Sequence, residues 1–315
     1  MTLFDVLVIG GGPAGLSVVT TLARQLHRVV LFDSGIYRNA LTEHMHNVAT
    51  WDHKPPEDYR REGREQILSR YDTIFFEDTE VKVVERTIHG HFKAFDAYGK
   101  FWTGRKLVLA TGVRDVFPDI EGYANCWATG IFHCLFCHGF EERGCASVGV
   151  LAVGDTGNVE AAMRVARMAR RFADSVTIYT HGAEELSQAL EDAADGTGIK
   201  VDKRPISRLV KGASKSEVQI VFKDLTIKTE GFLTHKPKTQ INGPFAYQLG
   251  LELTPDGDIK TIEPFYSTSV TGVFAAGDCA GPLKAVVTAM TSGSLVAAVL
   301  AGQLQSELYV ANNIK

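Results

Sequence analysis

The 315-residue sequence predicts an α/β protein with two doubly wound nucleotide-binding layers, because one local pattern occurs twice. In the first copy an apolar strand at residues 5–9 leads through a glycine-rich turn into a helix over 16–26 and a strand at 29–32. The second copy, over residues 148–179, repeats strand, glycine turn, helix and strand. Two copies indicate two such domains.

A run of short strands separated by glycine turns predicts a small antiparallel insertion between the two copies. We place these strands at residues 74–76, 81–84, 92–96 and 106–109. Residues 212–216 predict a hairpin loop, and a helix rich in small residues is expected over 286–305.

The composition is that of a soluble globular chain, with 45% hydrophobic and 22% charged residues. The formal net charge of −4 argues against a nucleic-acid binder, which needs an excess of Lys and Arg. We find no apolar run of the roughly 18–20 residues that a membrane span requires, so no membrane partner is expected. The first residues lack the basic region and cleavage site of a signal peptide, so we expect a cytoplasmic protein.

The chain has five cysteines, and an odd number in so long a chain is no disulfide framework. Cys134 and Cys137 have the spacing that lets one thiolate attack while the other resolves the mixed disulfide. A zinc site is the alternative, but the central four cysteines are not spaced like the paired knuckles of zinc ribbons. We therefore expect a redox-active pair and no metal. The other thiols are expected to be buried and structural, at Cys126, Cys145 and Cys279.

The first glycine turn has the pattern of a dinucleotide-binding site. Gly10 permits the tight turn, Gly12 lets a pyrophosphate approach the backbone, and Gly15 lets helix and strand pack closely. The helix N-terminus offers N–H groups and partial positive charge to the phosphates. Asp33 closes the next strand and is placed to accept hydrogen bonds from a ribose. Within the turn we also count Pro13 and Ala14 as cofactor-binding residues.

Two further segments distinguish FAD from NAD, and they do so by resemblance. Residues 107–112 resemble the ATG segment of two-dinucleotide-binding-domain flavoproteins, and residues 271–278 resemble their second flavin motif, whose Asp holds the FAD ribitol. The residues concerned are Ala110, Thr111, Gly112, Gly277 and Asp278. With the cysteine pair between these segments, the chain resembles the low-molecular-weight thioredoxin reductases over nearly its whole length.

This resemblance implies FAD as the cofactor and a homodimer as the assembly. It implies an FAD-binding domain formed by residues 1–118 and 242–315. A second domain, residues 119–241, is then inserted between them, resembles the NADPH domain of that family and carries the cysteines.

The segment around His44 and His46 is implied by the same resemblance to run past the flavin, with Asn47 near the cofactor. The two histidines are two residues apart and would share one side of an extended segment. No third metal ligand is evident beside them. One of them lines the substrate pocket, or both make ordinary polar contacts to FAD, and both alternatives stay open.

By the same resemblance, Cys134 exchanges with the substrate and Cys137 contacts the flavin. That family commonly has an Asp directly after the second cysteine as acid–base partner, whereas this chain has His138. An imidazole titrates near neutrality and can take the proton of a dithiol or stabilise a thiolate. His133, directly before the first cysteine, is a second candidate for this role.

The second glycine turn departs from a nicotinamide-binding fingerprint. Ala152 stands in place of its first glycine. A site selective for NADPH needs Arg or Lys after the next strand to pair with the 2′-phosphate, but neither occurs from Asp174 to Ile199. No carboxylate ends that strand to hold the free ribose of NADH. We expect a domain that keeps its fold without its usual ligand.

Without a nicotinamide donor, electrons enter through sulfur, pass from the cysteine pair to FAD and reach O2, giving H2O2. The sequence is similar to the gliotoxin-type dithiol oxidases of fungal epipolythiodioxopiperazine pathways at residues 42–48, 51–53, 134–144 and 281–285. We therefore expect an FAD-dependent dithiol oxidase acting on a small-molecule dithiol. The alternative is an NADPH-dependent reductase of a thioredoxin-like protein. A flavin-bound redox sensor and a reductase fed by a partner protein also stay open.

Overall fold

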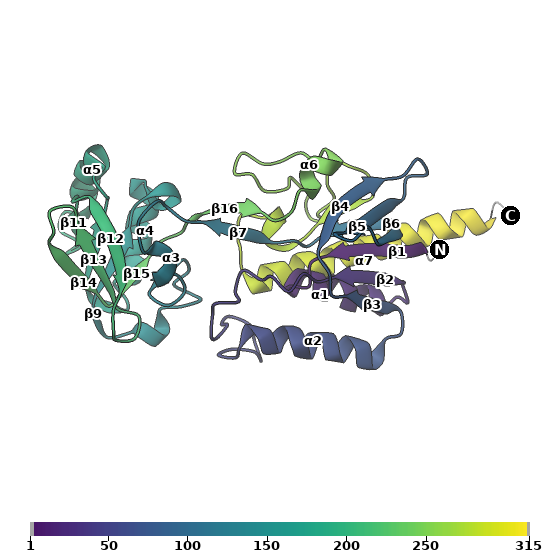
Figure 1. The fold of residues 1–315 in the computed structure, drawn as a ribbon, viewed down its shortest axis with the longest axis horizontal. Helices are drawn as coiled ribbons and strands as arrows, with labels where there is room; N and C mark the ends of the chain where they lie inside the picture. Colours follow the sequence, from purple (N-terminus) through teal and green to yellow (C-terminus); the bar gives the residue numbers. More distant parts are fainter. Residues whose placement is uncertain (1–2, 314–315) are drawn as a thin grey trace. The chain divides into compact units, whose positions relative to one another are not determined.

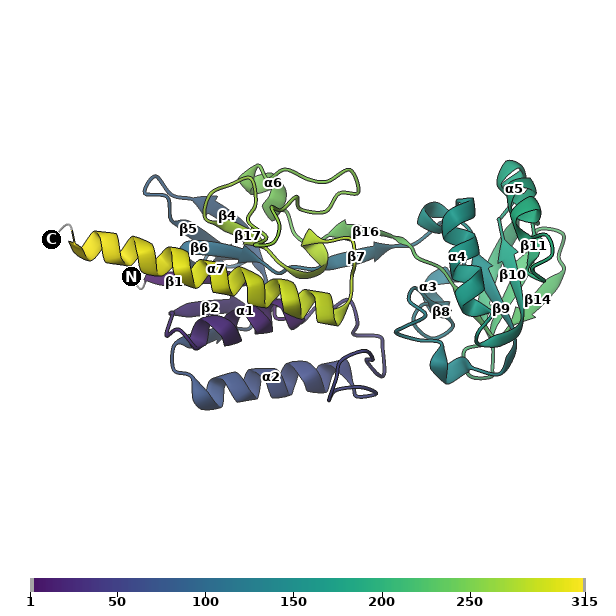
Figure 2. The ribbon, with the colours of Figure 1, turned by 180° about the vertical axis from the view of Figure 1, so that it is seen from behind.

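The computed structural model describes residues 3–313, with side chains described as far as Val310. By its internal contacts the chain divides into two compact units. The first unit comprises Met1–His44, Val48–Arg114 and Gln240–Lys315, and the second comprises Met45–Asn47 and Asp115–Thr239. Figures 1 and 2 show both units from opposite sides.

The first unit is built on one mixed sheet with strand order β3-β2-β1-β6-β5-β4, and β17 also pairs with β6. Its central strands are parallel, with Val8 opposite Leu31 on one side and Val108 on the other. The strands are β1 (Leu3–Ile9), β2 (Val29–Phe32), β3 (Ile74–Glu77), β4 (Val81–Arg86), β5 (Phe92–Asp96), β6 (Phe101–Leu109) and β17 (Val273–Ala275).

The predicted antiparallel insertion is wrong in its outer strands. β3 pairs in parallel with β2, and β6 pairs in parallel with β1 as well as antiparallel with β5. Only β4, β5 and β6 form an antiparallel meander. A short apolar run shows that a strand exists, but it does not show which neighbour the strand hydrogen-bonds to.

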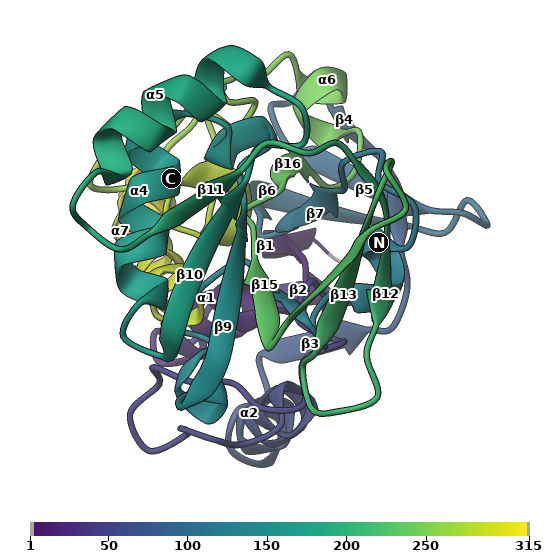
Figure 3. The same cartoon turned by 90° about the vertical axis from the view of Figure 1, so that its left-hand side faces the viewer.

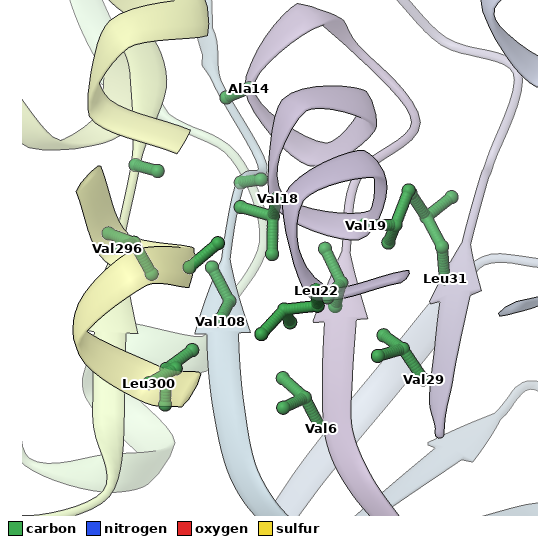
Figure 4. Close-up of a cluster of buried hydrophobic side chains, with 14 of the residues drawn as sticks. Val6, Ala14, Val18, Val19, Leu22, Val29, Leu31, Val108, Val296 and Leu300 are labelled. Carbon is green, nitrogen blue, oxygen red and sulfur yellow. The ribbon is translucent and has the colours of Figure 1, made fainter. Parts of the chain in front are cut away.

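Helices α1 and α7 cover one face of this sheet, and their side chains form the core drawn in Figure 4. Val8 and Val108 point into that core, whereas Leu7 and Leu107 lie in the core on the opposite face, as alternation along a strand requires. A Cβ at Gly293 would stand 2.3 Å from the Ala14 carbonyl oxygen, so glycine lets α7 approach α1 closely. The helices are α1 (Pro13–Ala23), α2 (Pro56–Arg70), α6 (Phe245–Leu249) and α7 (Val286–Asn313), with a short 3-10 turn η3 (Gly277–Ala280).

Helix α7 is apolar because it is a core helix. Contrary to the expectation that no apolar run is long enough, its stretch Val286–Val310 could cross a membrane by length and composition, with a mean hydropathy of 1.5. Val296, Leu300 and Leu304, however, are fully buried in the cluster that α7 forms with α1. The helix therefore does not indicate a membrane protein.

The second unit repeats the α/β theme with a parallel sheet in the order β11-β10-β9-β15-β8, of which Figure 3 labels the first four strands, and a three-stranded antiparallel sheet β12-β13-β14. Val150 of β9 lies opposite Ile178 of β10. The strands are β8 (Ile131–Phe132), β9 (Cys145–Leu151), β10 (Ala173–Tyr179), β11 (Lys200–Asp202), β12 (Ile206–Lys211), β13 (Val218–Phe222), β14 (Ile227–Glu230) and β15 (Phe232–Thr234). The helices are α3 (Tyr123–Cys126), α4 (Val159–Ala169) and α5 (Glu184–Ala194), with 3-10 turns η1 (Phe140–Glu142) and η2 (Gly154–Thr156).

The chain passes between the units along two strands, β7 (Val113–Val116) and β16 (Lys238–Ile241), which pair with each other. Between these two strands the Arg114 guanidinium donates a hydrogen bond of 2.6 Å to the Gln240 side-chain oxygen.

Candidate active site

The glycine turn between β1 and α1 is shaped by close backbone approach. Gly10 has φ +120°, and a Cβ there would stand 2.2 Å from the Ala110 carbonyl oxygen. A Cβ at Gly15 would stand 1.9 Å from the Gly10 oxygen. Around Gly12, in contrast, nothing lies within 4 Å of such an atom. The backbone therefore leaves no room for a side chain at Gly10 and Gly15, but it leaves open space at Gly12, where a pyrophosphate would approach.

Asp33 lies directly beside this turn, at the end of β2. Its carboxylate accepts hydrogen bonds from the Tyr37 hydroxyl at 2.5 Å and from the Gly35 N–H at 3.0 Å. A Cβ at Gly11 would stand 2.1 Å from an Asp33 oxygen. Burial and the neighbouring carboxylate raise the pKa of Tyr37 far above its ordinary value, so the phenol keeps its proton. The acid is thus held in place beside the glycines.

A cavity of about 630 Å³ opens between this turn and helix α2, a volume within the usual range for small-molecule sites. Three arginines of α2 line it: Arg60, Arg61 and Arg64. The Arg60 guanidinium lies 3.8 Å from the centre of the Tyr37 ring. The cavity joins a carboxylate suited to a ribose with cations suited to phosphates, so its residues fit the adenosine diphosphate half of FAD.

The two flavin-motif segments lie at the same edge of the sheet, because β1, β6 and β17 are parallel and end together. A Cβ at Gly277 would stand 2.9 Å from that of Ala14. Thr111 is held by the Asn242 side chain, which donates to its carbonyl at 2.9 Å. Asp278 forms an ion pair with Arg38 at 3.1 Å.

In the second unit Cys134 and Cys137 form a disulfide, with their Cα atoms 5.2 Å apart. They lie in a turn after β8, where the Cys137 N–H donates to the Cys134 sulfur at 3.1 Å. Both cysteines are half-buried, and Phe136 between them is 73% exposed. The disulfide is accessible and ready for exchange with a thiolate.

The remaining cysteines are separate thiols. Cys126 and Cys279 are buried, whereas Cys145 is half-buried. The Cys145 thiol contacts two backbone carbonyl oxygens, those of Ser147 and Phe172. Burial raises the pKa of all three thiols, which keeps them protonated and unreactive.

His138 follows the disulfide and is packed by its ring. Its imidazole stacks on the Phe132 ring at 4.8 Å between centroids, and its Nδ1 atom is buried without a hydrogen-bond partner. Burial, and then the charge of nearby His46, lower the pKa of His138, so the ring is neutral near pH 7. His133 instead stacks on Trp127 at 5.7 Å. Of the two histidines, His138 thus has a free nitrogen that can accept a proton.

The predicted segment at Asn47 belongs by its contacts to the disulfide unit. The Asn47 amide donates to the Phe136 carbonyl at 2.7 Å, and His46 contacts the Cys137 carbonyl through Nδ1 at 2.7 Å. His44 stays with the first unit, stacked on His53 at 4.2 Å. A role of Asn47 at the cofactor stays a prediction.

Comparison with known proteins decides the family. The sequence pattern of the pyridine nucleotide-disulphide oxidoreductases matches residues 4–293. The chain belongs to this family.

Fungal relatives in the family extend along nearly the whole chain. Thioredoxin reductase aclD of Aspergillus oryzae is 46% identical over 305 residues, which cover 96% of this chain and 96% of the relative. Thioredoxin reductase sirT of Leptosphaeria maculans is 44% identical over 302 residues, 93% of this chain and 91% of the relative. The crystal structure of the oxidoreductase from Agrobacterium tumefaciens is 30% identical, with a TM-score of 0.87 over 96% of this chain and 99% of that one. The protein is thus an FAD-binding, thioredoxin reductase-like oxidoreductase, which confirms the predicted fold class and cofactor.

The second glycine turn of this family member differs from the first. Seven residues separate β9 from α4, including η2, whereas three separate β1 from α1. Asn158 caps α4, because its side chain accepts the Ala161 N–H at 2.9 Å, while Gly12 leaves α1 without a side-chain cap. One N–H at the N-terminus of α4, that of Ala161, is therefore already bonded to the chain's own side chain instead of being free for a pyrophosphate.

The end of β10 is where the structure corrects the sequence analysis. Residues 174–199 contain no Arg or Lys, but the chain after β11 brings Lys203 and Arg204 to that edge. Lys203 pairs with Glu184 at 2.6 Å, and Arg204 with the Asp202 carboxylate. Lys203 and Arg204 are therefore present there, each paired with an acid, and Lys223 lies close enough to His181 to act on its charge.

Between these pairs lies His181, directly after β10. Its Nδ1 atom accepts the Ile206 N–H at 3.0 Å, and burial lowers its pKa, so it adds no positive charge near pH 7. A 2′-phosphate would have to compete with an existing ion pair to bind Lys203 or Arg204.

Sequence reasoning missed three contributors to these sites: the arginines of α2, the Asn158 cap and Glu141. The cap had a visible signal, since Asn directly before an apolar helix is a common N-cap. Glu141 carries no local signal, because its partner His46 lies far away in the sequence.

Proposed function

We propose that the protein is an FAD-dependent dithiol oxidase that forms a disulfide in a small-molecule dithiol of the epipolythiodioxopiperazine type, with O2 as acceptor and H2O2 as product. The observation that carries the proposal is the state of the second nucleotide-binding turn: Asn158 caps α4, and Lys203 and Arg204 near β10 are paired with acids. Because NADPH would have to displace these contacts, we take sulfur as the entry for electrons.

The cysteine turn performs the exchange. One substrate thiolate attacks the Cys134 sulfur, the bond to Cys137 breaks, and its electron pair stays on the Cys137 sulfur. The second substrate thiol then attacks the substrate sulfur of the mixed disulfide, which closes the substrate disulfide and breaks the bond to Cys134, so that the electron pair leaves on the Cys134 sulfur. Neutral His138 accepts one of the two substrate protons at Nδ1.

Bound FAD supplies a two-electron acceptor for the resulting dithiol, and O2 takes the pair, so that dithiol plus O2 becomes disulfide plus H2O2. The glycine turn and the arginine-lined cavity hold its adenosine half. Under this proposal residues 1–118 and 242–315 form the FAD domain, and residues 119–241 are the inserted domain. We also propose a cytoplasmic homodimer, as the family resemblance implies.

The substrate class is supported by the apolar surface beside the disulfide. Phe136 is 73% exposed and Phe140 is 63% exposed, and both lie within three residues of Cys137. Exposed aromatic rings suit a compact apolar dithiol. The fungal relatives are, however, named thioredoxin reductases, which favours the alternative, an NADPH-dependent reductase of a thioredoxin-like protein.

Mixing the purified holoenzyme with NADPH or with a dithiol in the absence of O2 distinguishes the oxidase from the reductase. For the oxidase we expect no loss of flavin absorbance with excess NADPH, rapid loss with dithiothreitol or a diketopiperazine dithiol, and recovery with stoichiometric H2O2 on adding O2. Cys134→Ser and Cys137→Ser should abolish peroxide release, and Cys145→Ser, which changes a separate thiol, should retain it. Rapid flavin reduction by NADPH would reject the oxidase in favour of the reductase.

A further inference from the structure

The segment Met45–Asn47 is held against the cysteine turn although the residues on both sides of it belong to the other unit. Met45 is buried, and the next two side chains bind backbone carbonyls of the last two residues of the cysteine turn. Asn47 donates to the Phe136 oxygen and His46 contacts the Cys137 oxygen, each at 2.7 Å. The half of the turn that contains Cys137 is thereby fixed.

The second nitrogen of His46 lies 3.3 Å from a carboxylate oxygen of Glu141. The carbonyl of Cys137 and the carboxylate of Glu141 are both acceptors, so only a ring with both N–H groups satisfies both contacts. The His46 side chain is 12% exposed. A positive charge in so sheltered a position acts on its neighbours with little screening by water.

We propose that His46, charged and held by Glu141, is a positioning residue that stabilises the thiolate left on Cys137 when the disulfide opens. This inference rests on the proposed thiol exchange. When a substrate thiolate bonds to the Cys134 sulfur and the sulfur–sulfur bond breaks, the electron pair goes to Cys137 as the leaving group. A leaving thiolate that is stabilised leaves faster, so the charge lowers the barrier of that step.

His46 and His138, which lie beside the disulfide, have different roles. The His46 and His138 rings meet edge to face at 6.3 Å, and burial, followed by the charge on His46, lowers the pKa of His138. His46 therefore provides charge, and His138 provides a place for a proton. Glu142, next to Glu141, accepts a hydrogen bond from Ser216 at 2.7 Å.

The test measures how reactive the Cys137 thiol is when it stands alone. In the FAD-loaded Cys134→Ser protein, the rate of iodoacetamide alkylation at Cys137 is followed against pH by mass spectrometry, since this rate follows the thiolate fraction. We compare His46→Asn, Glu141→Gln and the control Glu142→Gln. Asn keeps a donor near the Nδ1 position but carries no charge, and Gln at 142 still accepts from Ser216.

We expect the rate near neutral pH to fall about five- to tenfold in His46→Asn and less in Glu141→Gln, with the whole pH profile moved upward. Glu142→Gln should match the parent. If the alkylation rate of His46→Asn and of Glu141→Gln depends on pH as it does in the parent, the inference is wrong. If His46→Asn does not fold, the result for Glu141→Gln decides alone. Alkylation needs neither turnover nor O2 nor NADPH, so this outcome is independent of the test of the oxidase.

Discussion

The imidazole of His138 lies flat against the ring of Phe132, with 5° between the ring planes. Phe132 ends β8 and is buried, so the stacking removes water from one face of the imidazole. Desolvation disfavours the charged ring, which is the main reason why the pKa of His138 is lowered. A neutral histidine beside a disulfide is suited to accept the proton of an incoming thiol.

We therefore predict that His138→Asn lowers kcat/KM for a small dithiol by about 10²-fold or more. In the wild-type protein, activity should fall as the pH drops through the lowered pKa of His138, because the protonated ring no longer accepts a proton. Steady-state O2 consumption against pH measures both effects. An unchanged acid limb in the variant would assign that limb to another group.

The buried His235 should make the free energy of unfolding depend on pH. Its ring is buried, Nδ1 lies 2.7 Å from the Tyr123 hydroxyl, Nε2 lies 3.2 Å from the Val153 oxygen, and burial lowers its pKa to about 4. Between the unfolded and folded pKa values the unfolded chain binds the extra proton, so stability falls as the pH drops from about 6.5 towards 4. The loss is on the order of 3 kcal/mol.

Urea unfolding of the second unit within the whole protein, measured at several pH values, checks this expectation. His235→Gln serves as the comparison. The variant should be less stable near neutral pH but should lack this part of the acid sensitivity. Equal acid sensitivity in both proteins would show that other groups cause it.

Two glycines of the first turn should respond differently to the same change. Gly10→Ala places a Cβ against the Ala110 carbonyl and should reduce folding yield, while Gly12→Ala meets open space and should fold. The Cβ at position 12 occupies the approach of the pyrophosphate, so this variant should lose FAD. The ratio of flavin to protein absorbance gives the FAD content of each variant. A thermal melt with and without added FAD then shows whether a variant is folded. Full flavin content in Gly12→Ala would contradict our placement of the cofactor.

Asn158→Ala should cost about 1 kcal/mol of stability, the usual effect of removing an N-cap. Urea unfolding gives the value, and Asn158→Asp, which keeps an acceptor, should restore most of it. A loss in Asn158→Asp as large as in Asn158→Ala would mean that the side chain acts through some contact other than the cap.

The first half of the site was predictable because it is local. Gly10, Gly15 and Asp33 lie in one strand–turn–helix–strand unit, so their spacing alone fixes which atoms meet. Ala110 and Gly277 are distant in sequence, but parallel strands bring their ends to one edge of the sheet.

The second unit was harder to predict, because its decisive contacts are between elements. Lys203 follows β11, which pairs in parallel with β10, so it reaches the same edge as the end of β10 from outside the stretch that sequence reasoning searched. His46 and Glu141 meet because Met45–Asn47 belong by their contacts to the second unit, although their neighbours in the sequence belong to the first. No periodicity or motif in a single sequence reports such a contact.

The crossing of Met45–Asn47 has a practical consequence for dissecting the molecule. A fragment of residues 115–239 would contain every strand of the parallel sheet β11-β10-β9-β15-β8, yet it would leave the carbonyls of Phe136 and Cys137 without the side chains that bind them. Its cysteine turn would be looser than in the intact chain. Peptide 40–50 added in trans, or fused through a linker, is the natural way to rebuild an isolated redox module with its disulfide held as in the whole protein.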